Sequence, residues 1–115
     1  ERAHEFFELP EIRDFSPIRF MVYVTPVKKD KRHIIPAVTH VDGTGRLQTV
    51  SKEDNPRYYK LIEKFENKTK VPVILNTSFN LKGEPIVNSP EEAYSSFMRS
   101  GMDLLVLEKF IVAKT

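Results

Sequence analysis

Apolar and polar positions along the 115 residues predict a mixture of strands and helices. Short runs rich in β-branched and aromatic residues predict strands, at 19–25, 34–41, 46–50, 73–75, 104–107 and 110–112. Residues 1–9 predict a helix, and because no capping residue precedes it we expect the element to begin upstream. The expected fold class is α/β in the wide sense (α+β), with helices packed on a twisted mixed sheet.

Two helices carry the clearest local signals. Asn55 and Pro56 predict the start of the first, because asparagine caps a first turn and proline there loses no hydrogen bond. Its apolar stripe comprises Tyr58, Leu61, Ile62 and Phe65. Ser89 and Glu92 have the spacing of a capping box and predict the second helix, with Gly101 as its C-terminal cap. The residues expected to face the core from this helix are Tyr94, Phe97 and Met98.

Composition narrows the possible functions. Hydrophobic residues make up 40% and charged residues 30% of the chain, which is typical of a globular domain. A net charge of +2 is too small to indicate nucleic acid or a membrane surface as a partner. Without cysteine the chain has no thiolate ligands, and its three histidines lack metal-ligand spacing, so we expect no metal ligands. No run approaches the roughly 20 apolar residues of a membrane span, and the expected location is the cytoplasm.

One polar segment follows the apolar run 73–75. Its amide, hydroxyl and ammonium groups can bind phosphate or carbonyl oxygens; they belong to Asn76, Ser78, Asn80 and Lys82. The other interpretation is a turn whose asparagine and serine side chains satisfy nearby backbone groups. The residues by themselves leave both interpretations open.

A second polar segment contains His40 and Arg46 around a glycine-containing turn. Arginine matches phosphate with two parallel hydrogen bonds, and histidine can act as a base or a ligand. The alternatives are a surface ion pair for Arg46 and a partly buried, structurally satisfied imidazole for His40. The charged run 28–32 favours an exposed turn over a phosphate patch.

Four segments resemble motifs of one family, in the same order and at the same separations. They are 35–50 (IPAVTHVDGTGRLQTV), 55–59 (NPRYY), 73–87 (VILNTSFNLKGEPIV) and 89–93 (SPEEA). From Ser16 to the end, the chain is similar to the C-terminal domain of NodU/CmcH-type O-carbamoyltransferases of nodulation and antibiotic biosynthesis. The resemblance therefore divides the chain into residues 1–15, the tail of an upstream helix and a linker, and residues 16–115, the family domain.

That resemblance implies a YrdC-like fold and an enzyme that forms carbamoyl-adenylate from carbamoyl phosphate and ATP, with Mg²⁺ carried by the phosphates. An upstream domain of the sugar-kinase/actin-like superfamily would transfer the carbamoyl group to a hydroxylated acceptor. As a fragment of a longer protein, the chain alone is expected to be inactive. The alternative is a non-catalytic YrdC-like module that binds nucleotide or RNA.

The resemblance also implies roles for single residues. Arg46 and Ser78 are the expected catalytic residues, and Ser78 with Asn80 matches the Ser-x-Asn half of the family's nucleotide site. We expect Asn76, Lys82 and His40 to help bind the nucleotide or carbamoyl phosphate. The Lys-x-Arg half of that site is expected in the segment upstream of residue 1.

Overall fold

The computed structural model describes residues 2–9 and 16–114. The chain divides into two compact units, Glu1–Leu75 and Asn76–Thr115, and each is described by itself. Residues 10–15, where we expected a linker, lie outside the described residues.

An antiparallel hairpin organises the first unit. β1 (Tyr23–Pro26) pairs with β2 (Thr44–Leu47), with Val24 opposite Arg46 and Thr25 opposite Gly45. The strand predicted over 19–25 is therefore shorter, because a 3-10 helix η2 (Ser16–Phe20) occupies its first part. Thr25 is buried, whereas Val24 is exposed, so this hairpin has only one covered face.

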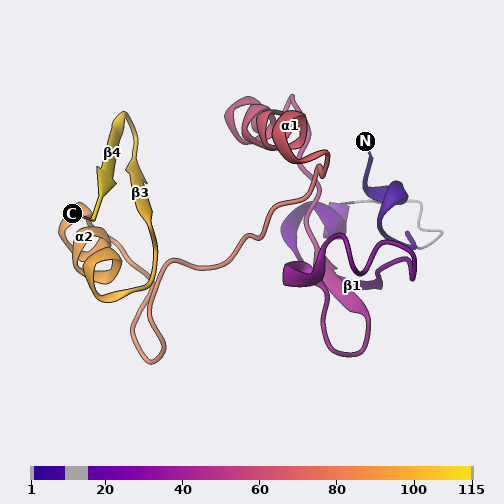
Figure 1. The fold of residues 1–115 in the computed structure, drawn as a ribbon, viewed down its shortest axis with the longest axis horizontal. Helices are drawn as coiled ribbons and strands as arrows, with labels where there is room; N and C mark the ends of the chain where they lie inside the picture. Colours follow the sequence, from indigo (N-terminus) through magenta and orange to yellow (C-terminus); the bar gives the residue numbers. More distant parts are fainter. Residues whose placement is uncertain (1, 10–15, 115) are drawn as a thin grey trace. The chain divides into compact units, whose positions relative to one another are not determined.

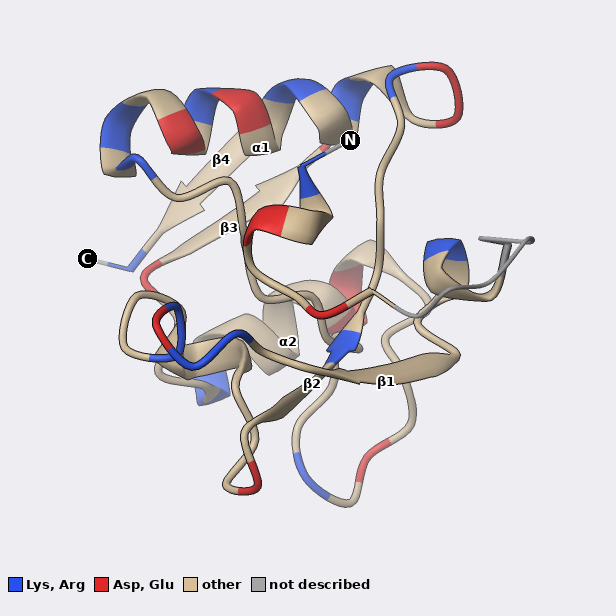
Figure 2. Cartoon of the chain, turned by 90° about the vertical axis from the view of Figure 1, so that its right-hand side faces the viewer, with Lys and Arg blue, Asp and Glu red and all other residues tan. Residues whose placement is uncertain are grey.

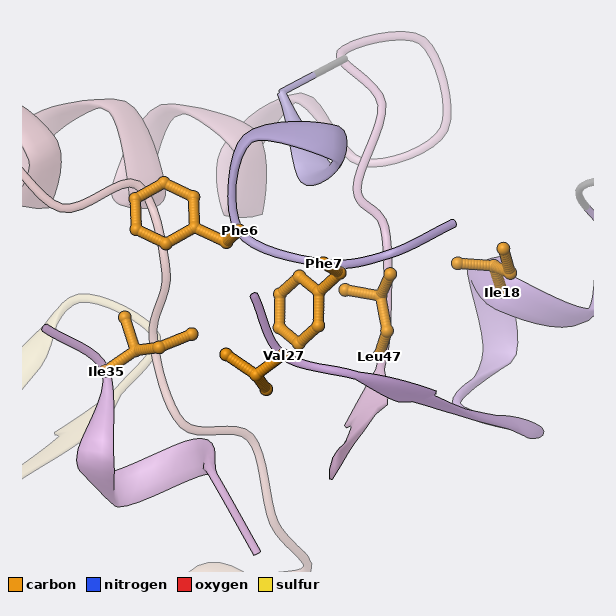
Figure 3. Close-up of a cluster of buried hydrophobic side chains, with 6 residues drawn as sticks. All are labelled: Phe6, Phe7, Ile18, Val27, Ile35 and Leu47. Atoms are coloured by element: carbon orange, nitrogen blue, oxygen red, sulfur yellow. The ribbon is translucent and has the colours of Figure 1, made fainter. Parts of the chain in front are cut away.

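The N-terminal segment completes the core of this unit. The predicted helix over 1–9 is wrong: only η1 (Ala3–Glu5) forms, as a single 3-10 turn. Beyond it the chain runs beside the continuation of β1, where Phe7 pairs with Val27 and the Glu8 N–H donates to the Pro26 carbonyl (2.9 Å). Figure 3 shows the side chains buried together here, which are Phe6, Phe7, Ile18, Val27, Ile35 and Leu47.

Two further predicted strands of this unit are not formed. Residues 34–41 contain the 3-10 helix η3 (Pro36–Val38). Proline explains this, because Pro36 lacks the N–H that a strand ladder needs. Residues 73–75 form no strand either, although Val71 and Val73 pack against the core.

α1 (Pro56–Thr69) confirms the first predicted helix. The Asn55 side chain caps it by accepting from the Tyr58 N–H (3.1 Å). The predicted apolar stripe is only partly covered, since Leu61 remains 55% exposed and no residue of α1 is fully buried. Basic and acidic residues alternate along the helix, as Figure 2 shows.

The second unit packs one helix against one hairpin (Figure 1). α2 (Pro90–Arg99) begins as predicted, with Ser89 accepting from the Glu92 N–H (3.2 Å), and Glu92 reaches back to the Asn88 N–H (2.7 Å). β3 (Leu104–Leu107) and β4 (Phe110–Ala113) pair antiparallel, as their apolar runs predicted. The helix ends at Arg99, and its C-terminal cap is Ser100 rather than the predicted Gly101.

The core of the second unit is small. Phe97 is fully buried, with Ala93 and Leu105 beside it. The prediction that Tyr94 and Met98 face the core is wrong, because these side chains are 51% and 48% exposed. Ala93 and Phe97 are one helical turn apart, and this narrower stripe contacts the hairpin.

The α+β class is confirmed. Helices and strands are both present, and the strands of the described residues form two separate two-stranded antiparallel sheets. One mixed sheet was expected. The runs at 34–41 and 73–75, which were expected to contribute strands to that sheet, are not strands.

Phe7→Ala tests whether the N-terminal segment belongs to the core. Because Phe7 is 4% exposed, we expect the substitution to lower the free energy of unfolding of the 115-residue chain by about 3–5 kcal/mol. Phe20→Ala is the matched control: Phe20 is 67% exposed, and its loss should change stability by less than about 0.5 kcal/mol. Equal urea midpoints for the two variants would contradict this packing.

Candidate functional site

The turn that precedes β2 contains the first candidate residue, His40. Backbone bonds close this turn, as the His40 N–H donates to the Thr44 carbonyl (2.7 Å) and the Gly43 N–H donates to the His40 carbonyl (2.9 Å). Asp42 Oδ1 accepts from the Thr44 N–H (2.9 Å) and from the Thr44 hydroxyl (2.7 Å). Nδ1 of His40 lies 3.0 Å from the same hydroxyl oxygen. We refer to residues 40–44 as the His40 turn.

Thr44 sets the charge state of this turn. Its backbone N–H and then its hydroxyl lower the pKa of the Asp42 carboxyl, and His40 adds a smaller electrostatic contribution. Hydrogen bonds to a carboxylate favour its ionised form, so Asp42 is an anion at neutral pH. An ionised carboxylate only accepts hydrogen bonds.

Arg46 lies two residues further along β2, on the same strand face as Thr44. That face is exposed, whereas Gly45 and Leu47 on the other face are buried. Within the part of the chain that the structure describes, the Arg46 guanidinium makes no hydrogen bond or ion pair. The surface ion pair considered above is therefore not formed there, and the structure brings Arg46 and the His40 turn to one face of β2.

Arg32 is a residue of this site that the sequence interpretation missed. The exposed turn predicted at 28–32 forms, but the Arg32 side chain folds back and its Nε donates to the Val27 carbonyl (3.1 Å). Its guanidinium lies over Gly43, where an added Cβ would be 2.3 Å from Cζ. Gly43 also has φ +83°, a conformation that favours glycine. A glycine after Asp42 signalled a turn, but nothing in the sequence pairs it with Arg32.

The second unit contains the Ser78 and Asn80 candidates in direct contact. The Ser78 hydroxyl donates to Asn80 Oδ1 (2.8 Å), and Asn80 Nδ2 donates to the Glu84 carbonyl (2.9 Å). Gly83, with φ +86°, lies in the turn between Asn80 and Glu84. The turn interpretation is thus correct for the Asn80 amide, whereas Ser78 retains its two lone pairs as acceptors.

An ion pair holds this turn to α2. Arg99 donates to both carboxylate oxygens of Glu84, with Nη2 3.1 Å from Oε2. Arg99 accordingly lowers the pKa of the Glu84 carboxyl. Lys82 is exposed at the same turn, and its ammonium contacts no acidic group of the described residues. Asn76 is exposed at the start of the unit.

The candidate residues therefore form two groups. His40 and Arg46 belong to the first unit, and the other four belong to the second. Among residues 2–9 and 16–114, no group of three or more histidine, aspartate or glutamate side chains could hold a metal ion.

An apolar hollow of about 410 Å³ lies elsewhere in the first unit. Residues 34–38, 71 and 73–75 line it together with Phe65 and Thr69 of α1. The Thr69 hydroxyl already donates to the Phe65 carbonyl (2.9 Å). This hollow contains neither His40 nor Arg46, and its lining offers no charged group.

Comparison with known proteins decides the family. The model of the family "Carbamoyltransferase C-terminus" matches residues 1–114. The chain belongs to this carbamoyltransferase family. The matched range includes residues 1–15, so the expected domain boundary at residue 16 stays a prediction.

Curated relatives agree with this family. The chain is 48% identical over 114 residues to "Nodulation protein NolNO" of Sinorhizobium fredii (strain NBRC 101917 / NGR234), covering 99% of this chain and 16% of that protein. It is 46% identical over 114 residues to "Nodulation protein NolO" of Bradyrhizobium diazoefficiens, covering 99% and 20%. Over 85 residues it is 38% identical to "3'-hydroxymethylcephem-O-carbamoyltransferase" of Amycolatopsis lactamdurans, covering 74% and 14%. The chain thus spans about a fifth or less of the length of these relatives.

No helix within the described residues has the length and apolar character needed to cross a membrane.

Gly43→Ala tests the contact with Arg32. We expect the free energy of unfolding to fall by about 1–3 kcal/mol because alanine is strained at this positive φ. Displacing the Arg32 hydrogen bond should lower it by about 1 kcal/mol more. In an Arg32→Ala background the second part should disappear, which a double-mutant cycle in urea would measure. If Gly43→Ala destabilises the Arg32→Ala background as much as it destabilises the wild type, the Arg32 side chain does not contact Gly43. Gly83→Ala supplies the comparison for positive φ alone, since no atom lies within 4 Å of its added Cβ.

Thr44→Val tests the electrostatics of the His40 turn. Because two hydrogen bonds from Thr44 lower the pKa of Asp42, removing the hydroxyl should raise this pKa toward its ordinary value. A depressed carboxyl pKa stabilises the fold above about pH 4, and this stabilisation is lost as pH falls through the folded-state pKa. Carboxyl NMR titration of the 115-residue chain checks the shift, with Thr49→Val as the control. An Asp42 titration identical in wild type and Thr44→Val would contradict the network.

Proposed function

We propose that the full-length protein is an O-carbamoyltransferase in which this domain forms carbamoyl-adenylate from carbamoyl phosphate and ATP. Family membership supports the carbamoyl chemistry. The observation that carries the site assignment is Arg46, a guanidinium on an exposed strand face that no carboxylate of the described residues neutralises. Such an arginine is available to bind phosphate with two parallel hydrogen bonds.

The proposed conversion balances with one water. Water cleaves the bond between the carbamoyl group and phosphate, which releases inorganic phosphate and carbamate. A carbamate oxygen then attacks the α-phosphorus of ATP, and pyrophosphate leaves. Both steps need negative charge to be held and neutralised more than they need a protein nucleophile.

Each candidate residue has a specific part in this proposal. Arg46 neutralises phosphate oxygens, and Lys82 supplies a second cation from an exposed turn. Ser78 accepts a hydrogen bond from the nucleotide, because its proton is already donated to Asn80. Asn80 positions Ser78 rather than touching the ligand, since its amide donates within its own turn. Asn76 and His40 complete the binding residues.

Other components of the proposal lie outside this chain. Mg²⁺ would arrive bound to the ATP phosphates, as expected for an ion that keeps few protein ligands. The Lys-x-Arg half of the nucleotide site and a sugar-kinase/actin-like transferase domain are proposed for the remainder of the polypeptide. The acceptor is a hydroxylated molecule, as the name of the cephem O-carbamoyltransferase suggests for that relative.

ATP–pyrophosphate exchange by the full-length protein tests the proposal. Exchange should require carbamoyl phosphate. Arg46→Ala should reduce its kcat/KM on the order of 10²–10³-fold, because a charge-stabilising contact is lost. Ser78→Ala should reduce it about tenfold or more, the equivalent of one lost hydrogen bond.

The controls are exposed residues that carry the same kind of group, a cation or a hydroxyl, and that are not candidate residues. Lys64→Ala on α1 removes a surface cation, and Ser95→Ala on α2 removes a surface hydroxyl. Both variants should exchange at the wild-type rate. A folded wild-type protein that shows no exchange would refute adenylate formation and favour the alternative, a nucleotide- or RNA-binding module. In that case, salt-dependent RNA affinity would identify the ligand.

A further inference from the structure

The hydrogen bonds of the His40 turn determine where the imidazole proton lies. The Thr44 hydroxyl has one proton, and it donates this proton to the carboxylate of Asp42 (2.7 Å). An ionised carboxylate has no proton to give back. The 3.0 Å contact between Thr44 Oγ1 and His40 Nδ1 must therefore be made by a proton on Nδ1. In the neutral imidazole this leaves the lone pair on Nε2.

The side chains of His40 and Asp42 consequently each keep an acceptor atom that the network does not use. One is Nε2 of His40, which makes no hydrogen bond to the described residues. The other is Oδ2 of Asp42, since both bonds from Thr44 go to Oδ1. Both side chains are exposed, so a ligand can reach them.

A cation, Arg46, lies on the same face of β2 as Thr44, whose hydroxyl contacts His40. Thr44 and Arg46 occupy alternate positions on one face of β2, about 7 Å apart along the strand. A ligand that contacts both residues must offer an anion to the Arg46 guanidinium and an N–H donor to His40 Nε2.

Carbamoyl phosphate has this combination of groups. Its phosphate is anionic, and its amide carries two N–H donors. Acetyl phosphate has the same phosphate and carbonyl but a methyl group in place of the amide. Acceptors near the acyl group would therefore favour carbamoyl phosphate over acetyl phosphate, because a methyl group leaves those acceptors without a hydrogen bond.

We propose that the Asp42–Thr44–His40 chain fixes His40 Nε2 as an acceptor for the carbamoyl N–H and so selects carbamoyl phosphate over other acyl phosphates. This inference rests on the proposed function and adds a specificity determinant to it. His40 touches the substrate, whereas Asp42 and Thr44 act through His40 as positioning residues. Asp42 Oδ2 is the second side-chain acceptor of the same turn.

The experiment compares carbamoyl phosphate with acetyl phosphate in ATP–pyrophosphate exchange by the full-length protein. Wild type should prefer carbamoyl phosphate by a kcat/KM ratio on the order of 10⁴. His40→Phe should lower this ratio at least tenfold by reducing kcat/KM for carbamoyl phosphate, while the value for acetyl phosphate stays within about threefold. His40→Gln should retain most of the preference, because its amide oxygen can accept in place of Nε2.

Thr44→Val tests whether Thr44 acts by positioning the His40 imidazole or only by stabilising the backbone of the turn. It keeps the β-branched shape and removes the hydroxyl that holds the imidazole proton on Nδ1. Imidazole ¹⁵N NMR should show the Nδ1–H tautomer in wild type and its loss in Thr44→Val. The preference ratio should fall in the same variant, although its far-UV circular dichroism stays native.

The outcomes distinguish this inference from the proposed function. Exchange that requires carbamoyl phosphate, with an unchanged preference in His40→Phe and Thr44→Val, would overturn the inference and leave the function standing. An Nε2–H tautomer in wild type would overturn it as well. Absence of exchange with either acyl phosphate in folded wild type would refute both.

Discussion

The packing of Phe7 onto the β1–β2 hairpin is the constraint on which the first unit depends. Gly45 has no side chain on this face, and an added Cβ would lie 3.1 Å from the Phe7 ring and 3.0 Å from the Val38 carbonyl oxygen. The Phe7 ring and the last residue of η3, Val38, therefore both pack closely against β2 at Gly45. The His40 turn begins two residues after η3 and ends in β2, so it connects two segments that pack against each other at Gly45. The candidate site is exposed, but the backbone that carries it is attached to a buried core.

The two candidate turns use their polar groups differently. In the second unit, Asn80 satisfies backbone and Ser78 with its amide, and Arg99 neutralises Glu84, so most of the polar groups stabilise the turn itself. In the first unit the network uses the only proton of the Thr44 hydroxyl yet leaves acceptors on His40 and Asp42, and the Arg46 guanidinium has no acidic partner among the described residues. Groups that retain unused hydrogen-bonding capacity are the ones able to bind a ligand, which is why we assign the acyl specificity to the His40 turn.

Local signals predicted the parts of the fold that local interactions stabilise. Asn55 and Ser89 each accept from an N–H three residues later, so the helix starts could be placed without tertiary information. The β3–β4 hairpin was equally predictable, because its two apolar runs are separated by two residues. Prediction failed at residues 1–9, 34–41 and 73–75. There, the spacing of apolar residues was compatible with regular structure, but Pro36 interrupts the second segment and the pairing of Phe7 with Val27 decides the first.

The sequence by itself determined the carbamoyltransferase family, the helix caps and the identity of the candidate residues, since these depend on residue type and short spacing. Only the tertiary structure decided what each candidate side chain does. It folds Arg32 back over Gly43, turns the Asn80 amide into its own loop and leaves Arg46 without an acidic partner in the described chain. It also joins His40 to Asp42 through one hydroxyl. The physical reason is that a hydrogen bond depends on the position and direction of both partners, and the sequence specifies these only through the folded backbone.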